Sequence, residues 1–122
     1  MHPMNLAKIF SDLNRQHQGI DASAIISNTG LALFHDPMPG VDPDHASALS
    51  AAMLTWGEYA TKNLFTDTLD HVELRCSQGN ILLSRVSPDA LIAILTRNDV
   101  VLEQISNHLH HVLDEVSTTA LG

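Results

Sequence analysis

The feature that most constrains the fold of this chain is the stretch from Leu69 to Arg97, which has the pattern of three strands joined by two tight turns. Apolar and polar residues alternate along residues 69–77, so this strand should have one face in water, whereas residues 91–95 are apolar on both faces. Gly79 can adopt the positive φ of a short hairpin, and Ser-Pro-Asp at 87–89 favours a second turn. The stretch therefore predicts an antiparallel meander whose last strand is central in a sheet and whose first strand lies near an edge.

Length and charge limit what the chain can be. Its 122 residues are enough for one core, and we expect a single domain over residues 1–122. Fourteen acidic against six basic residues give a net charge of −8, which disfavours nucleic acid and anionic membranes as partners. The lone Cys76, the lack of an apolar segment after Met1 and the lack of a run of about 20 apolar residues predict a cytoplasmic protein without membrane insertion.

Three amphipathic helices are predicted around the meander. Capping residues mark their starts: Asn5, Asp42, and Asn98 or Asp99. The first helix should end at a left-handed Gly19 and the second near Asn63. The third carries an apolar stripe at Leu102, Ile105, Leu109, Val112 and Val116, and residues 117–122 form a frayed tail.

A hairpin is predicted between the first two helices. Its strands cover residues 21–28 and 31–35, with Ile25 and Ile26 on opposite faces and an Asn-Thr-Gly turn at 28–30. The element order is therefore helix, two strands, helix, three strands, helix. It predicts an α+β domain with three layers, α/β/α, around a five-stranded antiparallel sheet.

The second helix has three faces to assign. The stripe expected to lie on the sheet is Ala46, Leu49, Met53, Trp56 and Ala60. A flanking stripe of mainly small residues, which would let another helix approach, is Ala48, Ala52, Thr55 and Tyr59. The opposite face is Ser47, Ala51, Leu54, Glu58 and Lys62.

The order and spacing of these elements resemble the Roadblock and dynein light chain domain family. The residues that carry the resemblance are a Gly-Ile-Asp-Ala-Ser-Ala strand at 19–24, the Asn-Thr-Gly turn, Leu-Ala-Leu at 31–33, an Ala-rich helix at 44–63 and the meander with its Gly turn. The resemblance implies a Roadblock/profilin-like fold. It also implies a homodimer in which the edge strand and the Ala-rich helix pair with their two-fold mates, which merges two sheets into one.

The resemblance implies a function as well. Bacterial members of the family are non-catalytic regulators of small Ras-like GTPases, including the partner that stimulates hydrolysis by the gliding-motility GTPase. Eukaryotic members bridge dynein chains or scaffold GTPases on membranes. Two alternatives stay open for this chain: a structural adaptor without effect on GTPase turnover, and a profilin-like or PAS-like sensor that binds a small ligand between sheet and helix.

The residues themselves favour self-association. The strand at 69–77 has neither proline nor lysine to protect its edge. Antiparallel pairing about Leu74 would set Glu73 opposite Arg75 of a second copy, twice over. The predicted dimer interface is Ala48, Ala52, Thr55 and Tyr59 from the helix with His71, Glu73 and Arg75 from the strand.

Partner binding is assigned to a helix face. Two copies of Ser47, Ala51, Leu54, Glu58 and Lys62 could form a docking platform for the GTPase, and the alternative is a solvated face with one exposed leucine. No arginine lies in a finger-like loop, so any stimulation of hydrolysis would come from remodelling of the GTPase site.

No catalytic, cofactor or metal site is predicted. His108, His110 and His111 form the densest group of the eight histidines, but a tetrahedral ligand set is incomplete there. Cys76 falls on the apolar face of the strand at 69–77, with Val72 and Leu74, and is expected to be a small buried hydrophobe. The turn at 28–30 lacks the lysine of a nucleotide-binding loop. Trp56 and Tyr59 are expected to pack in the core or at an interface.

Overall fold

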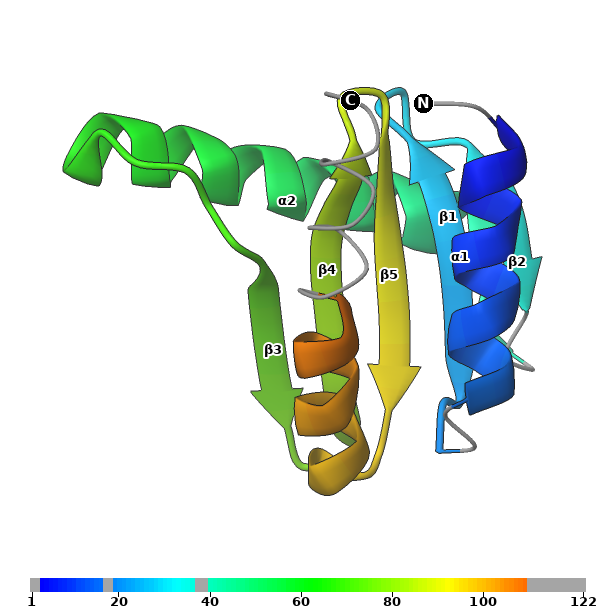
Figure 1. Ribbon diagram of the computed structural model, residues 1–122. Helices are drawn as coiled ribbons and strands as arrows, with labels where there is room; N and C mark the ends of the chain where they lie inside the picture. Colours follow the sequence, from blue (N-terminus) through cyan, green and yellow to red (C-terminus); the bar gives the residue numbers. More distant parts are fainter. Residues whose placement is uncertain (1–2, 17–18, 37–39, 110–122) are drawn as a thin grey trace.

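A five-stranded antiparallel sheet forms the middle layer of the computed structural model, which describes residues 3–16, 19–36 and 40–109 (Figure 1). The strands are β1 (Ala22–Ser27), β2 (Ala32–Asp36), β3 (Val72–Cys76), β4 (Gly79–Ser87) and β5 (Ala90–Thr96). They lie in the order β2-β1-β5-β4-β3. The predicted meander is confirmed, with β5 in the centre and β3 at an edge.

Helices cover both faces of this sheet. Helix α1 (Pro3–Gln16) and a C-terminal helical segment at 99–109 lie on one face, and helix α2 (Pro43–Phe65) crosses the other (Figure 1). Ile25 belongs to the core beneath α1 and the C-terminal segment, whereas Ile26 belongs to the core beneath α2. The predicted three-layer α/β/α fold is therefore confirmed. Within the described ranges, no helix is long and apolar enough to cross a bilayer.

The turns follow from glycine and proline. Gly30 has φ of 87°, and its N–H donates to the Ser27 carbonyl at 2.9 Å, which closes the β1–β2 hairpin. A Cβ at this position would also lie 3.2 Å from the Ala48 backbone, so glycine lets the hairpin approach α2. The β3–β4 turn is made by residues 77–78, and Gly79 already begins β4.

Side-chain caps fix two helix starts. The Asp42 carboxylate accepts from the Asp44 N–H at 3.1 Å, as predicted, and α2 continues to Phe65, two residues beyond the expected end. The Asn98 side chain accepts from the N–H groups of Val100 and Val101 at 2.9 and 3.2 Å, so Asn98 caps the C-terminal segment.

The start of the first helix was predicted wrongly. Helix α1 begins at Pro3, so Asn5 lies inside it and does not cap it. Proline suits a first helical position because its missing N–H has no partner there in any case. The predicted left-handed Gly19 end depends on residues 17–18, and Val112, Val116 and the tail at 117–122 also lie outside the described residues.

The face of α2 that packs on the sheet also differs from the prediction. Ser47, Ala51 and Leu54 are buried, whereas Leu49, Met53 and Trp56 are exposed. Small side chains on the buried stripe let the helix backbone lie close to the sheet, and Leu54 belongs to the same buried cluster as Ile26 and Leu83. The larger apolar residues are therefore left on the outside.

Candidate functional site

The outer face of α2 presents large apolar side chains to solvent. Leu49 is 51% exposed, Met53 36%, Trp56 71% and Tyr59 62%. The rings of Trp56 and Tyr59 meet edge to face, with centroids 6.0 Å apart and an angle of 81° between the planes. Packing of these two rings in the core is excluded by their exposure. An exposed cluster of this kind is typical of a surface that contacts another protein.

A hollow lies beside this cluster, between α2 and the β1–β2 turn. Its volume is about 250 Å³, and it is lined by Asn28, Thr29, Gly30, Ala48, Ala51, Ala52, Thr55 and Trp56. Three of the four helix residues predicted for the dimer interface, Ala48, Ala52 and Thr55, thus lie on the side of α2 that faces this turn. The structure does not bring them to the β3 edge, which α2 meets through Gly57.

The predicted partner-binding face requires a correction. Ser47, Ala51 and Leu54 form the buried stripe of α2, so they offer no surface for a GTPase. The sequence could not separate this stripe from the others, because several stripes of α2 have helical spacing. Lys62 is exposed, whereas Glu58 is half-buried against the sheet.

Glu58 holds α2 to the sheet through Arg85 on β4. The Arg85 Nε and Nη2 donate to the two Glu58 carboxylate oxygens at 2.7 and 2.9 Å. Arg85 Nη1 also donates to the side-chain oxygen of Asn28 at 2.7 Å. Paired, charge-assisted bonds of this kind fix direction as well as distance. The Arg85 guanidinium therefore joins α2, β4 and the β1–β2 turn.

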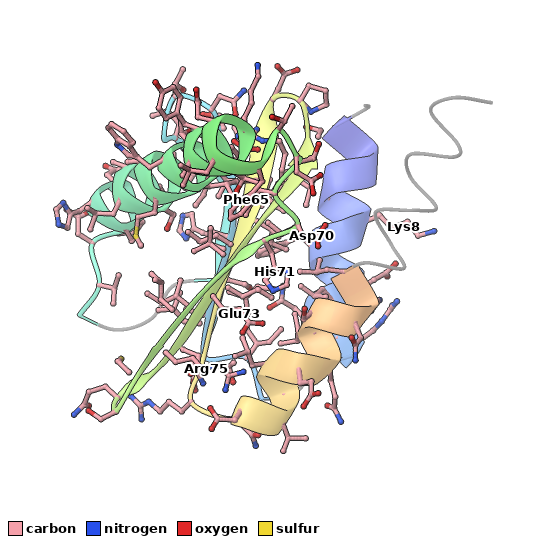
Figure 2. All side chains as sticks on the ribbon, turned by 90° about the vertical axis from the view of Figure 1, so that its left-hand side faces the viewer. Lys8, Phe65, Asp70, His71, Glu73 and Arg75 are labelled. Carbon is pink, nitrogen blue, oxygen red and sulfur yellow. The ribbon has the colours of Figure 1, made fainter. Side chains whose placement is uncertain are left out.

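The outer edge of β3 is the second candidate surface, and Figure 2 views the molecule from this side. Glu73 lies between His71 and Arg75, with its two carboxylate oxygens 3.1 Å from His71 Nε2 and 3.5 Å from Arg75 Nη2. Arg75 also lies 3.9 Å from Asp99 of the C-terminal segment. The three predicted strand residues are thus brought together at the edge.

The peptide groups of β3 alternate between β4 and the open edge. Cys76 and Gly79 flank a two-residue turn, so they form a hydrogen-bonded pair, and the pairs then alternate along the hairpin. The peptide groups of Leu74 accordingly face β4. Those of Glu73 and Arg75 face outwards, where no described strand pairs with them. A strand from another chain could add at this edge.

The sequence matches the model of a known domain family. The Roadblock/LC7 domain model matches residues 7–96, from within α1 to the end of β5. This chain belongs to the Roadblock/LC7 family. The predicted resemblance is thereby confirmed, although no curated protein sequence matches the chain.

Solved structures show the same Roadblock/LC7 fold. The Roadblock/LC7 domain from Streptomyces avermitilis has a TM-score of 0.72 at 15% identity and covers 92% of this chain and 94% of its own. MglB from Myxococcus xanthus gives 0.66 at 9% identity, with coverage of 85% and 90%. The gliding protein MglB from Thermus thermophilus gives 0.58 at 13% identity, with coverage of 92% and 90%. At such identities the likeness establishes the fold alone.

One further residue of this Roadblock/LC7 domain departs from its predicted setting. Cys76 is exposed, and the expectation of a buried hydrophobe is wrong. It is the last residue of β3, four residues beyond Val72, where α2 crosses the strand, so the helix no longer covers it. Its thiol donates to the Gly79 carbonyl at 3.1 Å. His108 is half-buried, and His110 and His111 lie outside the described residues.

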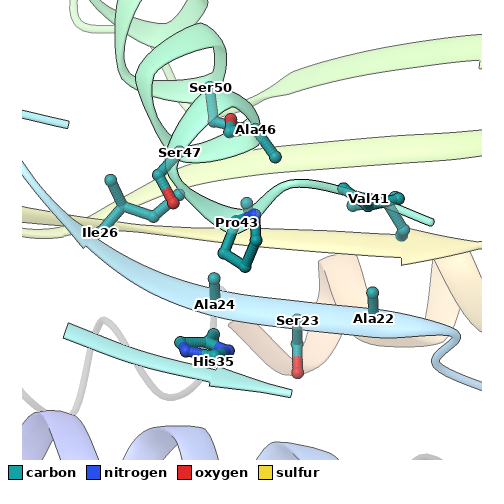
Figure 3. Close-up of a pocket in the computed structure, with 12 residues that line it drawn as sticks. Ala22, Ser23, Ala24, Ile26, His35, Val41, Pro43, Ala46, Ser47 and Ser50 are labelled. Atoms are coloured by element: carbon teal, nitrogen blue, oxygen red, sulfur yellow. Dashed lines mark hydrogen bonds between the residues drawn. The ribbon is translucent and has the colours of Figure 1, made fainter. Parts of the chain in front are cut away.

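A small cavity lies between the sheet and the first turns of α2 (Figure 3). Its volume is about 60 Å³, and its lining includes Ala22, Ala24, Ala46, Ser50 and His35. This volume corresponds to about two water molecules. Sites for metabolites usually have several hundred cubic ångströms, so the cavity does not favour the ligand-sensor alternative.

Sequence reasoning missed two residues at the end of α2. Leu64 and Phe65 are each 75% exposed, and the helix was expected to end near Asn63. The length of the helix was the available signal. A helix of 23 residues extends about 34 Å, whereas a sheet of five strands is about 20 Å wide, so the helix must project beyond the sheet.

Proposed function

We propose that this protein is a non-catalytic homodimeric regulator or adaptor that binds a small Ras-like GTPase and modulates its nucleotide hydrolysis or localisation. The observation that carries the proposal is the outward placement of large apolar residues on α2, next to an open sheet edge, in a Roadblock/LC7 chain. Neither surface is needed to complete the core. Both surfaces are suited to contacts with other chains.

The β3 edge is the proposed dimer contact. Two-fold pairing about Leu74 would place Glu73 opposite Arg75 of the second copy, and the peptide groups of both residues face outwards. Leu74 would then meet its own copy in a non-hydrogen-bonded pair, with its peptide groups kept for β4. The backbone orientation therefore supports this register, and opposite charges across the pair add to it.

The outer face of α2 is the proposed GTPase contact. We assign the contact to Leu49, Met53 and Trp56, because the predicted face with Leu54 is buried. The adjacent hollow could receive a side chain of the GTPase. Aromatic residues that stand beside such hollows often dominate binding energy at interfaces. The Roadblock/LC7 protein would remodel the catalytic site of the GTPase without contributing a reacting group.

Capture and turnover test the GTPase contact. The native protein is used to isolate partners from its own cytoplasm with GTP or GDP added, and any GTPase recovered is purified and assayed for binding and hydrolysis. Trp56→Ala should weaken this binding at least about 10-fold. Val100→Ala, which changes another well-exposed apolar residue on the other side of the sheet, should not. Unchanged binding in Trp56→Ala would move the contact off this face. A bound GTPase with unchanged turnover would favour the adaptor alternative.

Cross-linking tests the dimer contact. Leu74→Cys in a Cys76→Ser background should form a covalent dimer on oxidation, because Cα atoms of a non-hydrogen-bonded pair lie about 4.5 Å apart. Glu73→Cys in the same background is the matched control and should cross-link poorly. Arg75→Glu should weaken self-association, and the double exchange Glu73→Arg with Arg75→Glu should restore it. A protein that sediments as a monomer at all concentrations would refute the dimer.

A further inference from the structure

Phe65 continues the stripe of α2 that faces the sheet. Ser47, Ala51, Leu54 and Glu58 recur at steps of three and four along this stripe, and Phe65 stands seven residues after Glu58. The first three are buried, yet Phe65 is 75% exposed. The helix has therefore passed the edge of its own sheet, and Phe65 faces the place where a further strand would lie.

Packing at Gly57 marks the point where α2 leaves the sheet. A Cβ at Gly57 would lie 3.0 Å from the Leu69 side chain and 3.1 Å from that of Val72, the first residue of the edge strand. The end of α2 projects beyond β3 (Figure 1). The eight residues from Gly57 to Phe65 advance the helix by about 12 Å. That length corresponds to about two and a half strand spacings of 4.8 Å.

A groove lies on the face of the sheet that α2 covers, at the turn of the β3–β4 hairpin. Its volume is about 310 Å³, and its lining includes Cys76, Gly79, Ile81, Leu95, Thr96 and Arg97. Ile81 and Leu95 are cross-strand partners, and both are only partly buried. The groove therefore has an apolar floor that α2 of the same chain leaves uncovered.

The proposed two-fold register would place the projecting end of α2 above the groove of the second copy. If β3 pairs with its mate about Leu74, Val72 lies opposite Cys76 of the second copy. A helix that crosses above Val72 then continues above the second copy's Cys76 and, in the next strands, above its β4 and β5 ends. These are the residues that line the groove.

We propose that Phe65, flanked by Leu64, docks in this groove of a second copy, and that the reciprocal contact is made at the same time. The inference rests on the proposed dimer and names the helix contact that completes it. It assigns the two most exposed large apolar side chains of the described chain to self-association. The outer face with Leu49, Met53 and Trp56 then stays available to a different partner.

Photo-cross-linking tests the docking directly. A benzoylphenylalanine in place of Phe65 keeps an aromatic ring at this position, and mixing of isotopically labelled and unlabelled protein separates contacts between copies from contacts within one. We expect cross-linked peptides that join residue 65 to residues 76–81 or 95–97 of the other copy. The same probe in place of Trp56 should give none.

Dimer affinity supplies the second measurement. Phe65→Ala should raise the dimer dissociation constant at least about 10-fold, since the ring is lost twice in each dimer. Leu31→Ala, an exposed apolar residue at the β1–β2 turn, should leave it unchanged. If the native protein is a dimer but Phe65→Ala has native affinity and the probe marks only its own chain or a GTPase, the docking is refuted while the dimer stands. If the native protein is a monomer, the proposed dimer itself fails.

Discussion

Helix α2 and the C-terminal helical segment at 99–109 use their apolar residues in opposite ways. In the C-terminal segment, Leu102, Ile105 and Leu109 are all buried beneath the sheet's other face. In α2 the buried stripe is made mainly of small or polar residues, and the bulk faces solvent at Leu49 and Trp56. The difference shows that α2 contributes less apolar volume to its own core than it displays outside. A helix built this way suits contact with another chain.

Substitution of the buried Leu54 on α2 should destabilise the fold most. Leu54→Asp would place a carboxylate in the buried apolar cluster beneath α2, which contains Ile26 and Leu83, with the loss of leucine packing and no partner for the charge. We expect the free energy of unfolding to fall by more than about 4 kcal/mol, which approaches the whole stability of a small domain. Circular dichroism during thermal unfolding measures this loss. A stable, folded Leu54→Asp protein would show that Leu54 is not a core residue.

The burial of Leu54 beneath an exposed Leu49 and Trp56 shows which features the sequence could predict and which it could not. The meander, the β1–β2 hairpin and the Asp42 cap follow from alternation, turn residues and side-chain chemistry, which act locally. The assignment of α2 faces failed because Leu49, Met53 and Trp56 have the same periodicity as Ser47, Ala51 and Leu54. Hydrophobicity then favours the larger residues for the core, and that choice is wrong for a helix that also serves an interface.

Overpacking is the next effect in size. Ala51→Leu would insert a branched side chain where the helix lies close to the sheet, and we expect a loss of about 2 kcal/mol. Ala60→Leu places the same side chain at an exposed position of α2 and should change the free energy of unfolding by less than about 0.5 kcal/mol. Urea titration of both variants tests the difference. Equal losses would mean that the two positions share one environment.

The pairing of Glu58 with Arg85 should stabilise the sheet-facing side of α2 more than an exposed ion pair stabilises α1. Glu58→Ala removes two short bonds to a guanidinium whose side chain is only 28% exposed, so we expect a loss of about 1.5 kcal/mol. Asp12→Ala removes a pair in which the Arg15 side chain is 72% exposed, and should cost about 0.5 kcal/mol or less. Chemical denaturation of each variant gives the two values. A reversed order would remove Arg85 as an anchor of α2.

A leucine-to-aspartate change on the exposed face of α2 should alter stability least. Leu49→Asp lies five residues before Leu54, on the outer face, and its carboxylate would remain in water. We expect the free energy of unfolding to change by less than about 0.5 kcal/mol when it is measured below the concentration at which the protein self-associates. Binding to the GTPase should nevertheless weaken, because the charge would have to be desolvated in the contact. A loss of stability close to that of Leu54→Asp would mean that both faces of α2 support the fold, and the outer face could then no longer be assigned to a partner.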